Sequence, residues 1–185
     1  MKIYIFTLLS FIFLTKQALA QDFASVEKSI WQIQSLFVTK YLSNESKIKR
    51  DLALRSELGF DFFYRDGFLY DGPVVAWSPF LRLEPRHYYN LNKRADKGKK
   101  TAKNSGNFVA LTTTYKPNWF LITNESSLLV TPALSLIPTW GIRRSPWQHF
   151  NFEAGIGIGY GWEYYGHYSY GEVLVNLHLR FGFHL

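Results

Sequence analysis

Strict alternation of apolar and polar residues near the C-terminal end constrains this chain more than any other feature. From Val173 to Leu185 every odd position is Val, Leu or Phe, whereas the even positions carry Asn, His, Arg and Gly beside one Leu. Successive side chains of a β-strand point to opposite faces, while a helix would place the two sets on overlapping faces. The segment is therefore predicted as a strand with one apolar and one mostly polar face.

The same alternation recurs in six earlier segments, so the chain is predicted to be all-β. The clear strands cover 52–64, 75–89, 128–142 and 150–162, and two weaker ones cover 31–41 and 107–115. Polar or Gly-rich turns are predicted at 43–50, 65–72, 92–106, 143–148 and 163–170. No helix of useful length is predicted beyond the N-terminal segment.

The first twenty residues have the composition of a secretory signal peptide. Lys2 precedes an apolar run over 3–14, and Ala18-Leu19-Ala20 offers small residues for cleavage between Ala20 and Gln21. The run is short for a membrane anchor, which needs about 20 residues. We expect residues 21–185 to form one domain, without a transmembrane helix because charges interrupt every later apolar stretch.

Composition excludes several classes of function. The chain has no cysteine, which rules out disulfides, thiol catalysis and thiolate metal sites. Its formal charge is +7, and removal of Lys2 and Lys16 with the signal leaves +5. Aromatic residues make up 18% of the chain, a content that suits both strands and membrane interfaces. No cofactor or metal is expected.

The polarity of the two faces favours a membrane barrel over a soluble one. Soluble barrels and sandwiches are apolar inside, whereas a membrane barrel has lipid outside and a polar lumen. The apolar faces here continue without charged residues over strands longer than the usual length of about 5–6 residues. A tilted membrane strand needs about 9–11 residues, and these strands are long enough. Alternate glycines and mixed charges occupy the other face, and aromatic residues gather near the strand ends.

We therefore predict an antiparallel, up-and-down transmembrane β-barrel of about eight strands in the bacterial outer membrane. Seven strands are counted, and single-chain bacterial barrels have an even number, so one strand is missed or one segment splits. Prolines stand inside predicted strands, where each removes a donor from the hydrogen-bond ladder. They are Pro79, Pro85, Pro132 and Pro138.

Charged and histidine side chains on the polar faces form the candidate site. They are expected to pair across a narrow, side-chain-filled lumen. The set is Arg55, Glu57, Asp61, Arg82, Glu84, Arg86, Glu153, His178 and Arg180. The alternative is catalysis by a lumenal histidine and carboxylate, although no Ser-His-acid spacing is visible. Gly155-Ile156-Gly157-Ile158-Gly159 fits a crowded inner wall better than a nucleotide loop.

A second feature is a basic run in the longest predicted turn. It consists of Lys93, Arg94, Lys97, Lys99, Lys100 and Lys103, with Asp96 as the only acidic residue among them. The run is interpreted either as a solvated turn or as a surface for anionic lipid headgroups or lipopolysaccharide phosphates. Nucleic acid is not an expected partner of an exported protein. If the last strand ends in the periplasm, this turn is periplasmic as well.

The chain resembles a family of small, uncharacterised outer-membrane β-barrel proteins of Bacteroidota. The resemblance rests on Ala53–Gly59, Leu83–Arg86 with Tyr88–Arg94, Ile137–Arg144 and Gly155–Tyr160. It implies a barrel fold and an outer-membrane location, and no activity. The last strand is similar to the signal read by the barrel-assembly machinery, which usually ends in an aromatic residue, whereas Leu185 follows Phe181 and Phe183 here.

The leading hypothesis for function is a monomeric outer-membrane barrel of structural or binding type, with a filled polar lumen and no assignable activity. Its expected partners are outer-membrane lipid and, during biogenesis, the barrel-assembly machinery. Two alternatives remain open. One is an outer-membrane lipid hydrolase or acyltransferase that uses lumenal His and Glu residues, and the other is a secreted lipocalin-like carrier.

Overall fold

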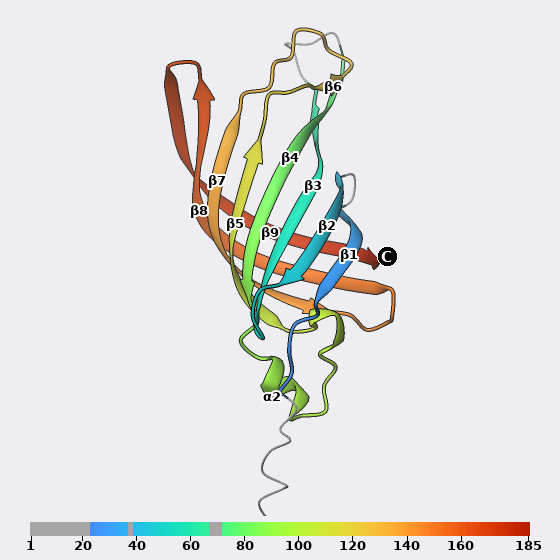
Figure 1. The fold of residues 1–185 in the computed structure, drawn as a ribbon. Helices are drawn as coiled ribbons and strands as arrows, with labels where there is room; N and C mark the ends of the chain where they lie inside the picture. Colours follow the sequence, from blue (N-terminus) through green and yellow to red (C-terminus); the bar gives the residue numbers. More distant parts are fainter. Residues whose placement is uncertain (1–22, 37–38, 67–71) are drawn as a thin grey trace, which may run out of the picture.

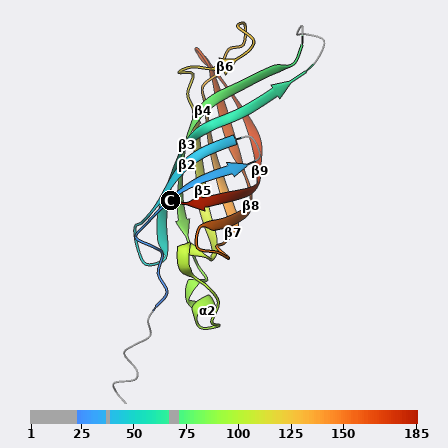
Figure 2. The ribbon, with the colours of Figure 1, turned by 90° about the vertical axis from the view of Figure 1, so that its right-hand side faces the viewer.

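A computed structural model describes residues 23–36, 39–66 and 72–185. The expected signal peptide and its cleavage positions, Ala20 and Gln21, lie outside the described residues. Nine strands of the described part form one antiparallel sheet that closes into a ring (Figures 1 and 2). The elements are β1 Ser29–Leu36, β2 Thr39–Lys47, β3 Leu52–Arg65, β4 Val74–His87, α2 Leu91–Ala95, η2 Ala102–Asn104, β5 Asn107–Lys116, β6 Ile122–Thr123, β7 Ala133–Arg144, β8 Phe150–Tyr165 and β9 Tyr168–His184.

The ring follows the order of the chain. β1 to β5 pair in succession, β7, β8 and β9 follow, and β9 pairs with β1. The two-residue β6 pairs only with the upper part of β4. These ladders confirm the predicted all-β, antiparallel fold. No helix in the described ranges is long and apolar enough to cross a membrane.

Two predicted segments divide differently in the structure. The single strand predicted at 31–41 is wrong, because β1 and β2 share that region and pair with each other as a hairpin. The turn predicted at 43–50 is also largely wrong, because β2 continues to Lys47. Ser43 and Glu45 face the interior while Asn44 and Ser46 face outward, so polar residues on both faces concealed the alternation.

The other departures concern the ends and connections of elements. The strand predicted at 128–142 begins only at Ala133, directly after Pro132. The basic turn predicted at 92–106 contains the short helices α2 and η2, which were not predicted. The turn predicted at 163–170 is a tight connection between β8 and β9 in which Gly166 has φ +60°, a conformation that favours glycine.

The prolines lie where few ladder bonds are lost. The β4–β5 ladder is interrupted across Pro85, and the β7–β8 ladder is interrupted across Pro138. Pro79 lies on β4 between its pairing with β5 and its pairing with β6, and Pro132 precedes β7. Because proline cannot donate a ladder hydrogen bond, these interruptions explain how the strands accommodate it.

The alternation places apolar side chains outside and polar side chains inside. On β9, Val173, Val175 and Leu177 are 65%, 69% and 78% exposed, whereas His178 and Arg180 are buried. Glycines of β8 line the inner wall, where a Cβ at Gly155 would collide with the imidazole ring of His178. The faces therefore have the predicted inverted polarity.

The ring closes through a short seam. β1 and β9 form four residue pairs, from Gln32 with His184 to Ser35 with Phe181. The β1–β2 hairpin ends well below the upper ends of β3, β4, β8 and β9 (Figure 1). Above Phe181, no strand of the described part pairs with β9 on that side.

The α2 end of the ring is closed by a small apolar cluster. Val26, Ala53, Tyr88, Leu91 and Phe108 are all buried and pack together there. The segment before β1 is held across this end, since the Val26 amide donates to the Arg50 carbonyl at 2.8 Å. The loop that carries α2 is thus part of the packed structure.

Candidate functional site

Strand register arranges the buried charges so that opposite signs face each other. In successive ladders Glu45 lies opposite Arg55, and Arg55 lies opposite Glu84. On the other side of the ring Glu153 lies between Arg143 and Arg180. Directly opposed unlike charges stabilise a pairing register, and like charges oppose it. The pairing register of the strands therefore places the residues of the charge network next to residues of opposite charge.

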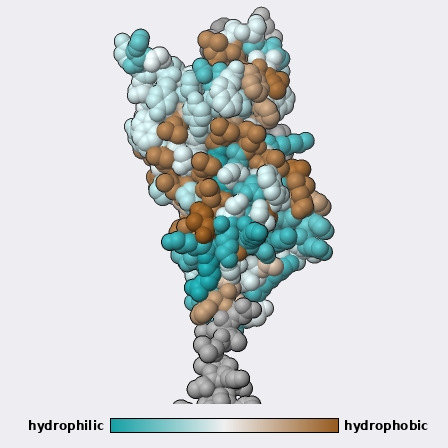
Figure 3. Space-filling view, viewed as in Figure 1, coloured by the Kyte–Doolittle hydropathy of each residue, from teal (hydrophilic) through white to brown (hydrophobic). Residues whose placement is uncertain are grey.

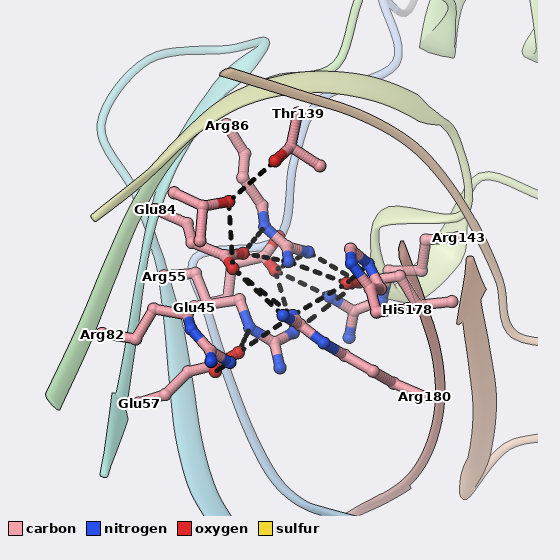
Figure 4. A network of polar contacts seen from close by, with 12 residues as sticks. Glu45, Arg55, Glu57, Arg82, Glu84, Arg86, Thr139, Arg143, His178 and Arg180 are labelled. Carbon is pink, nitrogen blue, oxygen red and sulfur yellow. Dashed lines mark hydrogen bonds and ion pairs between the residues drawn. The ribbon is translucent and has the colours of Figure 1, made fainter. Parts of the chain in front are cut away.

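Side chains from opposite walls then meet across the lumen (Figure 4). The Arg86 guanidinium on β4 donates two hydrogen bonds to Glu153 on β8, at 2.7 and 2.8 Å, and also donates to Glu84. Arg180 on β9 lies 3.2 Å from Glu153 and 3.3 Å from both Glu57 and Glu84. These bidentate and bridging contacts fill the cross-section with ion pairs.

The interior is close to electrically balanced. Four carboxylates, Glu45, Glu57, Glu84 and Glu153, are 4% exposed or less. Five guanidiniums contact them, from Arg55, Arg82, Arg86, Arg143 and Arg180. Five positive and four negative charges leave an excess of one positive charge. Buried ions are tolerated because each has partners of opposite sign.

Glu45 joins the network to the closed α2 end. It accepts hydrogen bonds from Arg143 at 2.7 Å, from the Tyr88 hydroxyl at 2.9 Å and from the side-chain amide of Asn104. Burial raises the pKa of Tyr88, as does the neighbouring Glu45 carboxylate, so its hydroxyl remains a donor. Asn104 also accepts from the Glu27 amide at 2.7 Å.

The structure brings together eight of the nine side chains grouped from sequence. Asp61 lies apart, in an ion pair with Lys116 at 2.7 Å, where both side chains are partly exposed. Arg82 joins the edge of the network through Glu57 at 2.7 Å. His178 lies 3.4 Å from Glu153 and 3.4 Å from the Asn176 side-chain oxygen.

Sequence reasoning missed two central members, Glu45 and Arg143. Both fall within predicted turns, although each continues the inward set of its strand, after Ser43 and Gly141 respectively. Following the period of two into those polar segments would have found them. Several amides were missed as well. Gln32, Gln34 and Asn104 bond to the ions directly, and Asn151 bonds to Gln32 and Gln34.

The basic run lies at the α2 end, outside the barrel wall. Lys93 and Arg94 belong to α2, and Lys103 belongs to η2. Lys97, Lys99 and Lys100 lie between the two helices and are exposed. The run is therefore separate from the charge network in the lumen.

No group of three or more His, Asp or Glu side chains with metal-binding geometry occurs in the described ranges. No family model, no curated protein and no solved structure matches this chain. The resemblance to a Bacteroidota barrel family thus stays a prediction.

Proposed function

We propose that this protein is a bacterial outer-membrane β-barrel of structural or binding type whose lumen is closed by ion pairs. The observation that carries the proposal is the inverted polarity of the sheet. Its outer face exposes aliphatic side chains, and its inner face holds the charges. Soluble monomers rarely expose apolar patches beyond a few hundred Å², so an aliphatic band around a ring favours lipid as its environment.

The height of the apolar band, worked from β8, supports a membrane environment. On the outer face of β8, the aliphatic residues Ala154, Ile156 and Ile158 lie between Phe152 and Tyr160. The eight steps from Phe152 to Tyr160, at about 3.4 Å each and tilted by about 40°, span about 21 Å. Barrels of this class have an apolar band about 25 Å tall between two aromatic girdles. In Figure 3 brown residues gather at middle height, with teal and white residues among them, above a teal region near α2.

Aromatic side chains extend the band at both ends. Trp31, Trp140 and Trp147 are exposed toward the α2 end, and Trp77 and Trp119 are exposed toward the other. The Trp140 indole donates to the Tyr89 hydroxyl at 2.8 Å. Amphipathic rings of this kind favour the membrane–water interface.

A barrel wall of eight strands, with β6 as an extension beside β4, accounts for a lumen without a channel. Side chains fill a barrel of that size. Here the network joins β2, β3 and β4 to β7, β8 and β9, and the apolar cluster closes the α2 end. The protein is therefore proposed as a closed barrel that acts through its surfaces and loops, and not as a porin.

The alternatives have weaker support. A lipocalin-like carrier needs its apolar face around a cavity, but that face is exposed here. A hydrolase needs a hydroxyl nucleophile beside its base, whereas the contacts of His178 within the described residues are with Glu153 and Asn176.

The proposal is tested by refolding residues 21–185 into phosphatidylcholine vesicles. We expect the protein to float with the vesicles, to resist trypsin within its strands, and to migrate differently on gels before and after boiling. Planar bilayers containing it are expected to show no steady conductance. A monodisperse folded protein without detergent or lipid would refute the membrane assignment, and stable conductance steps would refute the closed lumen.

A further inference from the structure

Positive charge is concentrated at one end of the barrel. Segment 93–103 carries six basic side chains and one acidic side chain. Segments 27–28 and 47–51 together carry four basic and two acidic side chains, and Arg144 adds one basic side chain. We call these residues the basic collar, with eleven basic against three acidic side chains. At the opposite end, segments 39–40, 61–66, 116–125 and 163–172 carry three basic against five acidic.

The cations of the collar are not neutralised by its own carboxylates. Asp51 pairs with His87 at 3.5 Å, and Glu27 accepts from the backbone amide of Lys103 at 3.1 Å. Within the described part of the chain, the only lysine in an ion pair is Lys116, at the opposite end. The collar therefore presents a field of one sign to its surroundings.

The collar is held in place by buried contacts. Lys103 and Asn104 have φ of 56° and 58°, a conformation that non-glycine residues seldom adopt. The buried Asn104 side chain compensates through its bonds to Glu45 and to the Glu27 amide. Leu91 is buried in the apolar cluster at the same end. A loop that served only as a solvated connection would need none of these anchors.

In the proposed membrane barrel, the collar lies directly beyond the nearer aromatic group. Tyr89 and Trp140 of the nearer aromatic group are hydrogen-bonded to each other, and α2 begins two residues after Tyr89. The Lys100 ammonium donates to the Pro146 carbonyl at 3.3 Å, beside the exposed Trp147. Cations directly outside an aromatic girdle face the phosphate layer of the bilayer.

From these observations we propose that the basic collar binds the phosphate groups of anionic phospholipids in the leaflet at the α2 end. This inference rests on the proposed membrane barrel. Each Lys or Arg at such a surface contributes about 1 kcal/mol, which is a factor of about five in affinity. Three lysines together then contribute a factor on the order of 100.

The test measures which lipid lies beside the collar. Because the chain has no cysteine, a fluorophore can be placed by Gln148→Cys in the exposed turn between β7 and β8. The labelled barrel is refolded into phosphatidylcholine vesicles containing a fraction of phosphatidylglycerol, and either lipid carries bromine atoms as the quencher. The ratio of the two quenching efficiencies reports the preference for the anionic lipid.

We expect phosphatidylglycerol to be preferred at low salt. The triple variant K93Q/K97Q/K99Q should reduce that preference at least tenfold, and so should 1 M salt, which shortens the screening length to about 3 Å. The matched variant K40Q/R65Q/K116Q removes three cations from the opposite end and should leave it unchanged.

Equal quenching by the two lipids would overturn the collar proposal. An equal loss of the preference for phosphatidylglycerol in both triple variants would overturn it as well. Displacement of phosphatidylglycerol by inorganic phosphate, but not by chloride at the same ionic strength, would also overturn it in favour of a free-anion site. A protein that fails to float with vesicles and shows no heat-dependent gel mobility instead contradicts the membrane barrel itself.

Discussion

Replacing Glu45 by Gln removes one negative charge from the buried network and nearly preserves the shape of the side chain. The interior then holds five guanidiniums and three carboxylates, so its excess rises from one to two positive charges. Arg143 loses its charged partner at 2.7 Å, and the amide group of the new Gln can direct an N–H toward a guanidinium. Removing one partner of a buried ion pair costs about 3–5 kcal/mol, and we expect a loss in that range.

Urea unfolding from phosphatidylcholine vesicles, followed by tryptophan fluorescence, measures this loss. Asp61→Asn is the matched control, because it removes a carboxylate from a partly exposed pair with Lys116, which is worth about 0–1 kcal/mol. A double-mutant cycle adds Arg143→Met alone and together with Glu45→Gln. The double variant restores the original excess of one charge. Its loss in the free energy of unfolding should therefore be smaller than the sum of the losses in the two single variants.

The reasoning fails if Glu45→Gln costs no more than Asp61→Asn. It also fails if the effects of Glu45→Gln and Arg143→Met add within about 0.5 kcal/mol, because residues that do not interact behave in that way. Either result would mean that water or a rearranged side chain satisfies the network, and that the lumen is not tightly closed.

Three further predictions follow from the same geometry. Leu177→Arg puts a charge on the outer face of β9 and should cost about 2–4 kcal/mol in vesicles, whereas Tyr168→Arg at the exposed hairpin tip should change stability by less than about 1 kcal/mol in the same urea assay. Gly155→Ala should cost about 1–3 kcal/mol because its Cβ meets the His178 ring, and His178→Ala in the same chain should relieve part of that loss. Alternate amides of β9 above Phe181 should exchange with deuterium faster than those of β8. The reason is that β8 is paired along both edges, whereas the upper part of β9 is paired along only one edge. Equal protection of the two strands would contradict the open seam.

The sequence predicts the architecture well because the two faces of each long strand differ sharply. Where that contrast is strong, as from Val173 to His184, the strand and the direction of its side chains were both predictable. Where both faces are polar, as in β2, the period of two is concealed, and the inward position of Glu45 could not be predicted. Local pattern also carries no information about α2, whose five residues are stabilised by the packing of Leu91 against the end of the barrel.

The charge network was only partly predictable for a different reason. A period of two assigns each residue to a face but does not say which residues of neighbouring strands lie opposite each other. Asp61 shares the inward face of β3 with Arg55 and Glu57, yet register places it beside Ser78 of β4, beyond the paired charges. Height along the barrel, which depends on register and strand tilt, separates it from the network.

The central claim is that the aliphatic face of the sheet contacts lipid while the charged face fills the lumen. Single cysteines along β9, from Val173 to Phe183, can carry a spin label in vesicles because the chain has no cysteine of its own. We predict that labels at Val173, Val175, Leu177 and Leu179 collide with lipid-soluble oxygen and are shielded from a water-soluble nickel chelate. Labels at even positions should be shielded from oxygen, which gives a period of two. Equal access of the nickel chelate to the odd positions, or the absence of that period, would contradict the membrane barrel.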